Sequence, residues 1–247
     1  MNIPLIVAGA ALGMLAVERW RPGRAWPRVH GWWPRALLLN AVQVAIVLVA
    51  GGLWDGWMAE HRPWSIEAWS LPLRVGAGDL AITFVYYVWH RARHASPMLW
   101  RWFHQVHHSP QRLEVIASFY KHPFEIAANG VLSSAILYLG VGLDVPAAGI
   151  VVLITGLAEL FYHWNIATPY WLGFLFQRPE SHCVHHEEGR HASNYSDLPL
   201  WDAVFGTLHN PRSFVGRCGF GSGEEQRLGE MLLGSEIGEH AGAKGSS

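Results

Sequence analysis

Apolar residues gather in five long stretches separated by polar and charged segments. These stretches are Ile3–Val17, Ala36–Trp54, Val75–Trp89, Pro123–Leu143 and Val145–Tyr162. A membrane-spanning helix needs about 20 predominantly apolar residues, and roughly 17 to 25 are observed. The second, fourth and fifth stretches meet this length, whereas the shorter first and third fit tilted or partly buried helices. The pattern predicts an all-α integral membrane bundle with about four to five spans or membrane-embedded helices.

The composition agrees with a membrane protein and excludes several other classes. Hydrophobic residues make up 51% of the 247 residues and charged residues only 15%, whereas soluble domains have roughly 25% charged residues. Disorder, collagen and coiled coil are therefore excluded. A nucleic-acid binder is not expected either, because 18 basic and 19 acidic residues give a formal net charge of −1. The 14 tryptophans suit a bilayer interface, where their amphipathic rings are enriched.

Basic residues are distributed unequally between the predicted loops. The loop after the first stretch holds Arg19, Arg21, Arg24, Arg28 and Arg35. Lys and Arg accumulate in cytoplasmic loops, so this loop is predicted to face the cytoplasm. Its arginines follow the apolar run, whereas a secretory signal places its cations first. The next loop, 55–74, holds only two of the 18 basic residues and is predicted to lie outside. We therefore expect an integral membrane protein, in the inner or plasma membrane if it is bacterial.

Many of the 15 histidines fall on the predicted cytoplasmic side of this topology. The fourth and fifth stretches form a hairpin whose short connection, 142–146, lies on the opposite side. Histidines before and after the hairpin are therefore expected to meet at one membrane face. They are His90, His94, His104, His107 and His108 after the third stretch, His122 before the fourth, and His163, His182, His185, His186 and His191 after the fifth.

Three histidine clusters have regular spacing. They read His90-Arg-Ala-Arg-His94, His104-Gln-Val-His107-His108 and His182-Cys-Val-His185-His186. Residues three and four apart share one face of a helix, so each cluster is predicted to point its imidazoles in one direction. A helix is expected for the first two clusters, whereas the third lies in a polar, loop-like stretch.

The clusters indicate a metal site at the cytoplasmic face of the membrane. Neutral imidazole suits zinc, copper, iron and nickel, and one ion needs only three or four such ligands. The number of histidines therefore predicts a site for two ions. The alternative is a set of surface histidines without metal, but their mutual repulsion on protonation makes that arrangement unfavourable.

The motifs around these clusters resemble one known family. They are Asp79–Tyr87 leading into His90-Arg-Ala-Arg-His94, then Trp102-Phe-His104-Gln-Val-His107-His108-Ser109, His163-Trp-Asn165, His182-Cys-Val-His185-His186, and Asn194-Tyr195-Ser-Asp-Leu-Pro-Leu-Trp201-Asp202-Ala-Val-Phe205-Gly206-Thr207. In order and spacing they resemble the fatty acid hydroxylase and sterol desaturase superfamily of integral-membrane di-iron oxygenases. The resemblance covers roughly half of the chain, and Ser196 stands where the family more often has glycine.

The resemblance implies a helical membrane fold with a cytoplasmic helical cap that holds two iron ions, and a monooxygenase with dioxygen as co-substrate. Zinc can replace iron in purified protein, because it binds such sites more tightly than ferrous iron does. Such an enzyme hydroxylates or desaturates an unactivated C–H bond of a lipid or other hydrophobic substrate that enters from the bilayer. The sequence does not separate these two outcomes. Electrons would come from a separate carrier, such as a ferredoxin or a b-type cytochrome with its reductase. The basic segment 91–121 is a candidate docking surface for an acidic carrier.

Nine histidines are expected to be the metal ligands, with no catalytic side chain beyond the metal centre. They are His90, His94, His104, His107, His108, His163, His182, His185 and His186. Some relatives have a second histidine beside the position of His163, where this chain has Ala167. Either His122 or His191 could fill that gap. Both could equally neighbour a ligand, and His122 could simply cap a helix.

Three carboxylates are candidates for supporting roles. Glu159 lies four residues before His163, and Glu125 lies three residues after His122. A carboxylate that accepts from the non-ligating ring N–H would orient an imidazole and raise its basicity. Asp79 lies within a short apolar stretch, where an ionisable group is usually functional. Each of the three could instead be a capping or snorkelling residue.

The motifs divide the chain into three parts. Residues 1–77 are expected to form N-terminal membrane helices and a basic loop, and 78–210 a histidine domain that contains the membrane hairpin 123–162. Residues 211–247 are expected to form a flexible tail, with one short helix near 226–233. Two alternative functions use the same histidines: a non-oxidative zinc metalloenzyme, for which no H-E-x-x-H motif is present, or a non-enzymatic metal- or haem-binding membrane protein.

Overall fold

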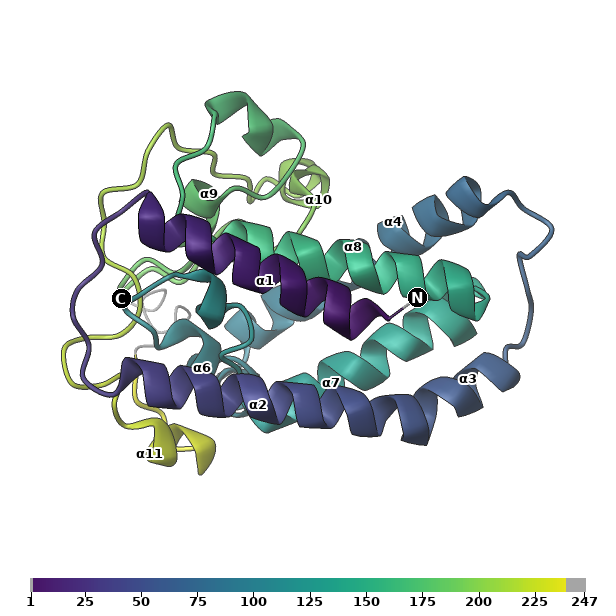
Figure 1. Ribbon diagram of the computed structural model, residues 1–247, viewed down its shortest axis with the longest axis horizontal. Helices are drawn as coiled ribbons and strands as arrows, with labels where there is room; N and C mark the ends of the chain where they lie inside the picture. The colour runs from purple at the N-terminus through teal and green to yellow at the C-terminus, as the bar shows by residue number, and fades with distance from the viewer. Residues whose placement is uncertain (1, 239–247) are drawn as a thin grey trace.

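The computed structural model describes residues 2–238 (Figure 1), and within them the regular secondary structure is helical. The long elements are α1 (Ile3–Trp20), α2 (Trp32–Ala50), α4 (Leu71–Ala95), α7 (Pro123–Ser134) and α8 (Val145–His163). The short α-helices are α3 (Gly56–Glu60), α5 (Pro97–Phe103), α6 (Gln105–His108), α9 (Pro179–His185), α10 (Pro199–Val204) and α11 (Leu228–Leu232). The π-helices η1 (Gly51–Asp55) and η3 (Ala135–Val141) and the 3-10 helices η2 (Val115–Ala117) and η4 (Tyr170–Phe174) complete the set. The all-α prediction is confirmed.

Four helical segments are long and apolar enough to cross a membrane. They are Ile3–Trp20, Trp32–Glu60, Pro123–Val141 and Val145–His163. The second runs continuously through α2, η1 and α3. The third apolar stretch of the sequence lies inside the 25-residue helix α4, which is long enough to span but carries charged residues at both ends. The number of spans therefore falls within the predicted range.

Helix boundaries follow local sequence signals. Asn2 accepts a hydrogen bond from the backbone N–H of Leu5 and caps α1. Prolines stand in the first turn of α7 and α8, where a missing N–H costs no hydrogen bond. Gly142 ends η3 with φ of 78°, and a Cβ at this position would lie 2.6 Å from the ring of Trp64. Only glycine fits this close, left-handed turn, which lets α7 and α8 form a hairpin.

The long helices form a bundle, and most of the short ones form a cap at one end of it (Figure 1). Within the bundle α1 packs against α8, α2 against α7, and α4 against α8 and η3. A core that contains Ile82, Leu137 and Val151 lies away from the cap. A second core joins α2 to the cap through Trp32, Trp100 and Tyr120. The two cores fix the cap to the membrane helices.

The segment predicted to be a flexible tail is packed against the cap as far as residue 238. Phe220 and Met231 belong to the core around Trp100. The side-chain amide of Gln105 donates to the carbonyl of Ser235 at 2.8 Å. Buried Glu225 accepts from Arg35 at 2.6 Å. The expectation of flexibility rested on composition, and these few apolar and charged anchors outweigh it; residues 239–247 lie outside the described residues.

The buried pair of Arg35 and Glu225 gives a test of this packing. Arg35→Met leaves the Glu225 carboxylate buried without its cation, so we expect a loss of about 3 kcal/mol in stability. Faster protease cleavage within 211–238 should accompany a lower thermal unfolding temperature in detergent. Arg227→Met is the matched control, because Arg227 pairs with Glu230 on the surface, and it should change little. Equal behaviour of the two variants would contradict the packing described.

Candidate metal centre

Four helices, α4, α6, α8 and α9, bring the nine histidines together. The last two turns of α4 carry His90 and His94. The residue His104 precedes α6, which carries His107 and His108. The third cluster lies on α9, with His186 directly after it, and not in a loop. This helix begins at Pro179, whose fixed φ favours a first helical turn. The ninth histidine, His163, is the last residue of α8.

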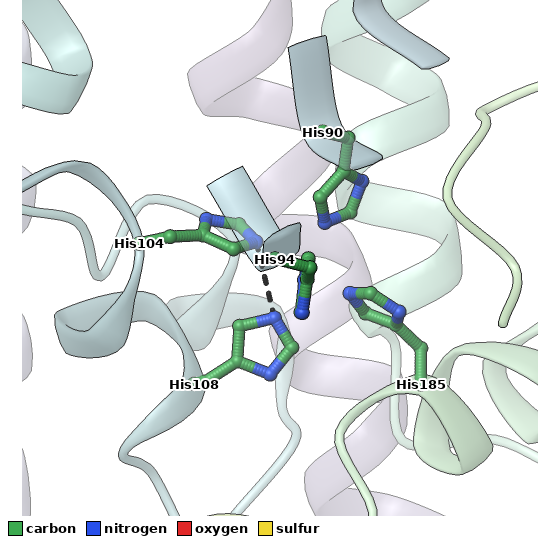
Figure 2. A group of neighbouring side chains, drawn as sticks. All are labelled: His90, His94, His104, His108 and His185. Carbon is green, nitrogen blue, oxygen red and sulfur yellow. Dashed lines mark hydrogen bonds between the residues drawn. The ribbon is translucent and has the colours of Figure 1, made fainter. Parts of the chain in front are cut away.

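The nine histidines form two groups. In each group one ring nitrogen per residue lies within 4.8 Å of the others. The five-histidine group, whose rings converge in Figure 2, consists of His90, His94, His104, His108 and His185. The four-histidine group consists of His107, His163, His182 and His186. All nine of the predicted ligands are therefore brought together, in two sets that could each hold one ion.

The two H-x-x-H-H clusters are divided between these groups, which corrects the expectation that each cluster points one way. His104 and His108, four residues apart, join the five-histidine group, while His107 joins the other. In the third cluster His182 and His186 belong to the four-histidine group, while His185 belongs to the five-histidine group. Neighbouring residues on a helix point about 100° apart. A cluster with adjacent histidines can therefore serve two sites at once.

Main-chain carbonyls orient three of the imidazoles. The Nδ1 atoms of His90 and His185 each lie 2.7 Å from a carbonyl oxygen, of Tyr195 and Ser193 respectively. His163 Nδ1 lies 2.9 Å from the carbonyl oxygen of Glu159. A carbonyl only accepts, so each Nδ1 carries the proton and Nε2 keeps its lone pair. This is the tautomer that a metal ligand needs.

The ring nitrogens approach one another as ligands of a common cation do. The Nε2 atoms of His104 and His108 are 3.1 Å apart. His182 Nε2 lies 3.2 Å from that of His163 and 3.1 Å from that of His186. Tetrahedral bonds of 2.0–2.1 Å to one ion place ligand nitrogens about 3.4 Å apart. The buried Nε2 atoms of His90 and His185 have no hydrogen-bond partner within residues 2–238. These residues therefore fit a pair of metal ions.

Burial keeps the rings neutral. Desolvation, followed by the charges of Arg93 and neighbouring rings, holds the pKa of His104 well below its ordinary value. The same cause lowers the pKa of His108 and His186, and burial lowers the pKa of His185 to about 3. Imidazole binds a metal only in its neutral form. The site is therefore ready for metal at neutral pH without releasing protons from these rings.

A buried ion pair contacts the five-histidine group. Glu125 pairs with Arg93, and both side chains are almost fully buried. Glu125 Oε1 also lies 3.2 Å from Nδ1 of His104. In the Nδ1–H tautomer His104 donates to this carboxylate and turns Nε2 toward His108. Glu125 thus contacts His104, a ligand candidate of the second cluster. Its position in the sequence had suggested a contact with His122 instead.

Two further predicted histidines lie outside both groups. His191 is buried, and its Nδ1 lies 3.1 Å from Nδ1 of His108, so it contacts the outer side of that ring. His122 caps α7 by accepting from the backbone N–H of Phe124 at 3.0 Å. Its Nε2 lies 3.3 Å from the carbonyl oxygen of Leu232. The geometry of His122 therefore matches the helix-cap alternative.

Two of the predicted carboxylates also lie differently from expectation. The Glu159 carboxylate pairs with Lys121, and it is the main-chain carbonyl of Glu159 that contacts His163. Asp79 lies on α4 eleven residues before His90, about 16 Å away along the helix. Its distance places it outside the metal groups. The four-residue spacing between Glu159 and His163 does not reveal whether the carboxylate or the main-chain carbonyl of Glu159 contacts the imidazole.

Three of the five cations in the basic segment 91–121 pair with carboxylates inside the protein. Arg93 and Lys121 are buried and pair with Glu125 and Glu159. Arg112 forms two hydrogen bonds with Glu114 at 2.6 and 3.0 Å. The sequence could not distinguish the pairs of Arg93 and Lys121 from surface cations, because their partners Glu125 and Glu159 lie outside the segment.

The structure adds residues at the site that sequence reasoning missed. Asp197 borders a small chamber together with His90 and His182. Burial, and then the nearby Glu159 carboxylate, raise the pKa of Asp197 to about 7, while a hydrogen bond from Tyr162 opposes the increase. The available signal was the position of Asp197 inside the Asn194–Thr207 motif. The Asp197 carboxyl is therefore a titratable group of a second kind, beside the imidazoles of His90 and His182.

A cavity of about 680 Å³ connects the metal groups with the outer surface of the bundle. Its walls come mainly from α1, α2, α7 and α8, and its inner end reaches His90, His104 and His107. Leu12 and Leu37 border it and are themselves 68% and 58% exposed. The cavity therefore opens between α1 and α2. From Ile3 to Leu15 it extends for about 18 Å along α1.

Fold and site together define a helical membrane protein whose buried histidines are arranged to hold two metal ions. Residues 75–207 match the fatty acid hydroxylase family, and the chain belongs to this family. The predicted family is confirmed. The part that matches contains all nine histidines of the two groups.

Three curated relatives are similar to the chain. Ornithine lipid hydroxylase OlsE of Rhizobium tropici is 32% identical over 162 residues, which cover 62% of this chain and 47% of that protein. Fatty acid hydroxylase vlmA of a Lecanicillium species is 29% identical over 198 residues, covering 71% and 52%. A cholesterol 25-hydroxylase-like protein of Danio rerio is 29% identical over 136 residues, covering 53% of each. The chain spans about half the length of these relatives. No solved structure matches it significantly.

The two groups predict metal binding that can be dissected by mutation. Purified protein loaded with iron or zinc should hold about two ions per chain, since three or four ligands suffice for each. We expect His182→Ala combined with His186→Ala to lower the content to about one, because only two histidines of the four-histidine group then remain. Metal content per chain, measured by elemental analysis, checks this.

The matched control for metal content is His122→Asn, which replaces a buried histidine outside both groups and keeps a helix-capping side chain. It should retain both ions. An unchanged metal content when both His182 and His186 are replaced by alanine, or an equal loss in His122→Asn, would contradict the assignment of the four-histidine group.

The lowered histidine pKa values predict how stability depends on pH. Below the ordinary histidine pKa of about 6.5 the unfolded chain binds protons that the native chain excludes. The stability of metal-free protein should therefore be full above about pH 6.5 and decrease as the pH falls below it. Thermal unfolding in detergent between about pH 8 and pH 5 measures the effect. His107→Ala combined with His185→Ala should make the unfolding temperature depend less on pH. An unfolding temperature of the unmutated protein that does not change with pH would show that the rings are not buried in neutral form.

Proposed function

We propose that this protein is a membrane-bound di-iron monooxygenase that hydroxylates an unactivated C–H bond of a lipid or lipid-like substrate. The balanced reaction consumes R–H, dioxygen, two electrons and two protons, and yields R–OH and water. One observation carries the proposal: two groups of buried, neutral histidines lie at the inner end of a mostly apolar cavity that opens between membrane helices. The hydroxylases named among the relatives support the same reaction class.

Iron suits the donor set, because imidazole nitrogen is a good ligand for iron as well as for zinc. The nine clustered histidines would hold two iron ions, which supply dioxygen activation when bound. Main-chain carbonyls and Glu125 would keep the ligating nitrogens directed at the ions. The bulky walls of the cavity would exclude water from the reacting C–H bond. Asp197, which accepts a hydrogen bond from Tyr162, is placed to hold a proton near the inner end of the cavity.

The substrate is proposed to enter sideways from the bilayer. The cavity opens between α1 and α2, where exposed Leu12 and Leu37 would contact lipid chains. An apolar chain could then reach the histidines without crossing water. Four charged side chains along the cavity form two ion pairs, Lys121 with Glu159 and Arg93 with Glu125. This arrangement favours a substrate whose reacting portion is apolar.

Electrons are proposed to come from a separate carrier, such as a ferredoxin or a b-type cytochrome with its reductase. The chain has two cysteines, fewer than the four that commonly bind an iron–sulfur cluster. The catalytic face is proposed to be cytoplasmic. Figure 1 shows the arginine-rich loop between α1 and α2 at the same end of the bundle as α6 and α9, which carry histidines. The positive-inside rule favours a cytoplasmic position for such a loop.

The activity is tested with iron-loaded protein in vesicles of bacterial lipid, supplied with a chemical or enzymatic reductant and ¹⁸O₂. A lipid product that gains one labelled oxygen supports the proposal, whereas loss of two hydrogens without labelled oxygen would indicate desaturation. His107→Ala with His185→Ala removes one ligand from each group and should abolish the product. Turnover that persists in this variant, or that requires zinc and no reductant, would contradict the proposal.

The cavity gives an independent prediction about substrate access. Ala11 borders the cavity on α1, and Ala11→Phe should lower kcat/KM by about tenfold, as a loss of about 1.4 kcal/mol of substrate binding would. Gly13→Phe is the matched control on the same helix, because a Cβ there would meet no neighbouring atom within 4 Å and Gly13 does not border the cavity. It should leave turnover close to that of the wild type. Similar effects of the two substitutions would exclude this route.

A further inference from the structure

We propose that η4 and α10 form a foot that inserts the cap into the lipid leaflet next to the metal centre. The foot consists of residues 170–176 and 199–205. Its exposed apolar side chains are Tyr170, Trp171, Phe174, Leu175, Phe176, Leu200, Val204 and Phe205. Trp171, Phe174 and Val204 are each about 60% exposed. Such a concentration of large apolar side chains marks a surface for lipid or protein.

The first half of the foot is held rigidly by buried polar contacts. Arg178 is fully buried and donates to Thr168 at 2.9 Å and to Asn210 at 2.7 Å. The Asn210 side chain in turn donates to the carbonyl of Tyr170 at 3.2 Å. At Gly173 a Cβ would lie 2.2 Å from Asn210, so η4 packs directly on this network. The hydrogen-bond network of Arg178 and Asn210 therefore holds the aromatic residues of η4 in place.

The second half of the foot is fixed to α4. The indole N–H of Trp201 donates to Thr83 at 3.0 Å, and its ring lies 4.9 Å from that of Phe84. Asp202 is fully buried and accepts from the backbone N–H groups of Tyr195 and Ser196. α10 therefore keeps its orientation, with Leu200, Val204 and Phe205 directed outward.

The foot continues an apolar stripe along α4. Leu73, Leu80, Phe84 and Val88 are exposed and recur at helical spacing on one face of this helix. Phe84 joins the stripe to α10, because its ring lies 6.3 Å from that of Phe205. In Figure 1, α10 lies along the flank of the bundle and not beyond its end. The continuity with a helix of the membrane bundle favours lipid as the occupant.

Arginines border the foot where lipid headgroups would lie. The guanidinium of Arg212 lies 4.9 Å from the ring centroid of Tyr170. Arg91 donates to the hydroxyl of Tyr87 at 3.1 Å, and the Tyr87 ring stacks on Phe205 at 5.1 Å. Aromatic side chains and cations at the edge of an apolar surface are typical of a membrane interface. A protein partner is not required to explain this combination.

Insertion of the foot would act on the metal centre through Asp202. This side chain belongs to α10 and holds the backbone of Tyr195 and Ser196. The carbonyl of Tyr195 orients His90, and Ser196 borders the small chamber at the histidines. The depth of the foot in lipid would therefore fix the position of a segment that lines the site.

The test uses an environment-sensitive dye on cysteine variants of the full chain in vesicles of phosphatidylcholine and phosphatidylglycerol. Phe174→Cys and Val204→Cys place the dye on the two halves of the foot. Val215→Cys is the matched control, because Val215 is an apolar residue of the cap that is 96% exposed and outside the foot. Unmutated protein gives the background, since Cys183 and Cys218 are both buried.

Dye on either half of the foot should have a blue-shifted emission, and lipid with brominated chains should quench it. Dye at position 215 should instead be quenched by aqueous iodide. Iodide quenching at positions 174 and 204 would overturn the proposal. Protection from both quenchers would overturn it as well, because a second copy or another protein would then cover the foot. Neither result depends on hydroxylase activity, so the proposed function is tested separately.

Discussion

The central constraint on this structure is the convergence of nine neutral imidazoles inside a protein. Ring nitrogens only 3.1–3.2 Å apart point at one another, which is favourable when a cation takes their lone pairs. Much of the cap serves this arrangement. Carbonyls of Tyr195 and Ser193 fix two of the rings, and the buried pair of Arg93 and Glu125 supports His104. These supports come from segments far apart in sequence, so the cap has to fold as a unit.

Sharing of the clusters makes the two metal groups interdependent. Each H-x-x-H-H cluster gives two histidines to one group and one to the other. A movement of α6 or α9 therefore displaces ligand candidates of both groups together. This coupling explains why the short helices are so firmly held: α6 is tied to the C-terminal segment by Gln105, and α9 follows the buried Arg178.

The membrane helices enclose the cavity as well as anchoring the cap. α1 packs against α8, and α2 packs against α7. The space between these two helix pairs forms the cavity that ends at the histidines. A soluble protein would fill such a space or expose it to water. In a bilayer an apolar opening costs little free energy, because the acyl chains that contact it are as apolar as its walls. The bilayer thus permits a long apolar cavity to reach a polar cluster of histidines.

The sequence by itself determined the helical class, the apolar hairpin, the family and the nine clustered histidines, because helix length, apolar runs and ligand spacing are local properties. The tertiary structure alone decided how the clusters divide between two groups, since that depends on the angle at which α6 and α9 meet α4 and α8. It also decided that a carbonyl and not the Glu159 carboxylate orients His163, and that residues 211–238 pack on the cap instead of forming a tail. In each case the partner lies far away in the chain, where spacing along the sequence carries no information about distance in space.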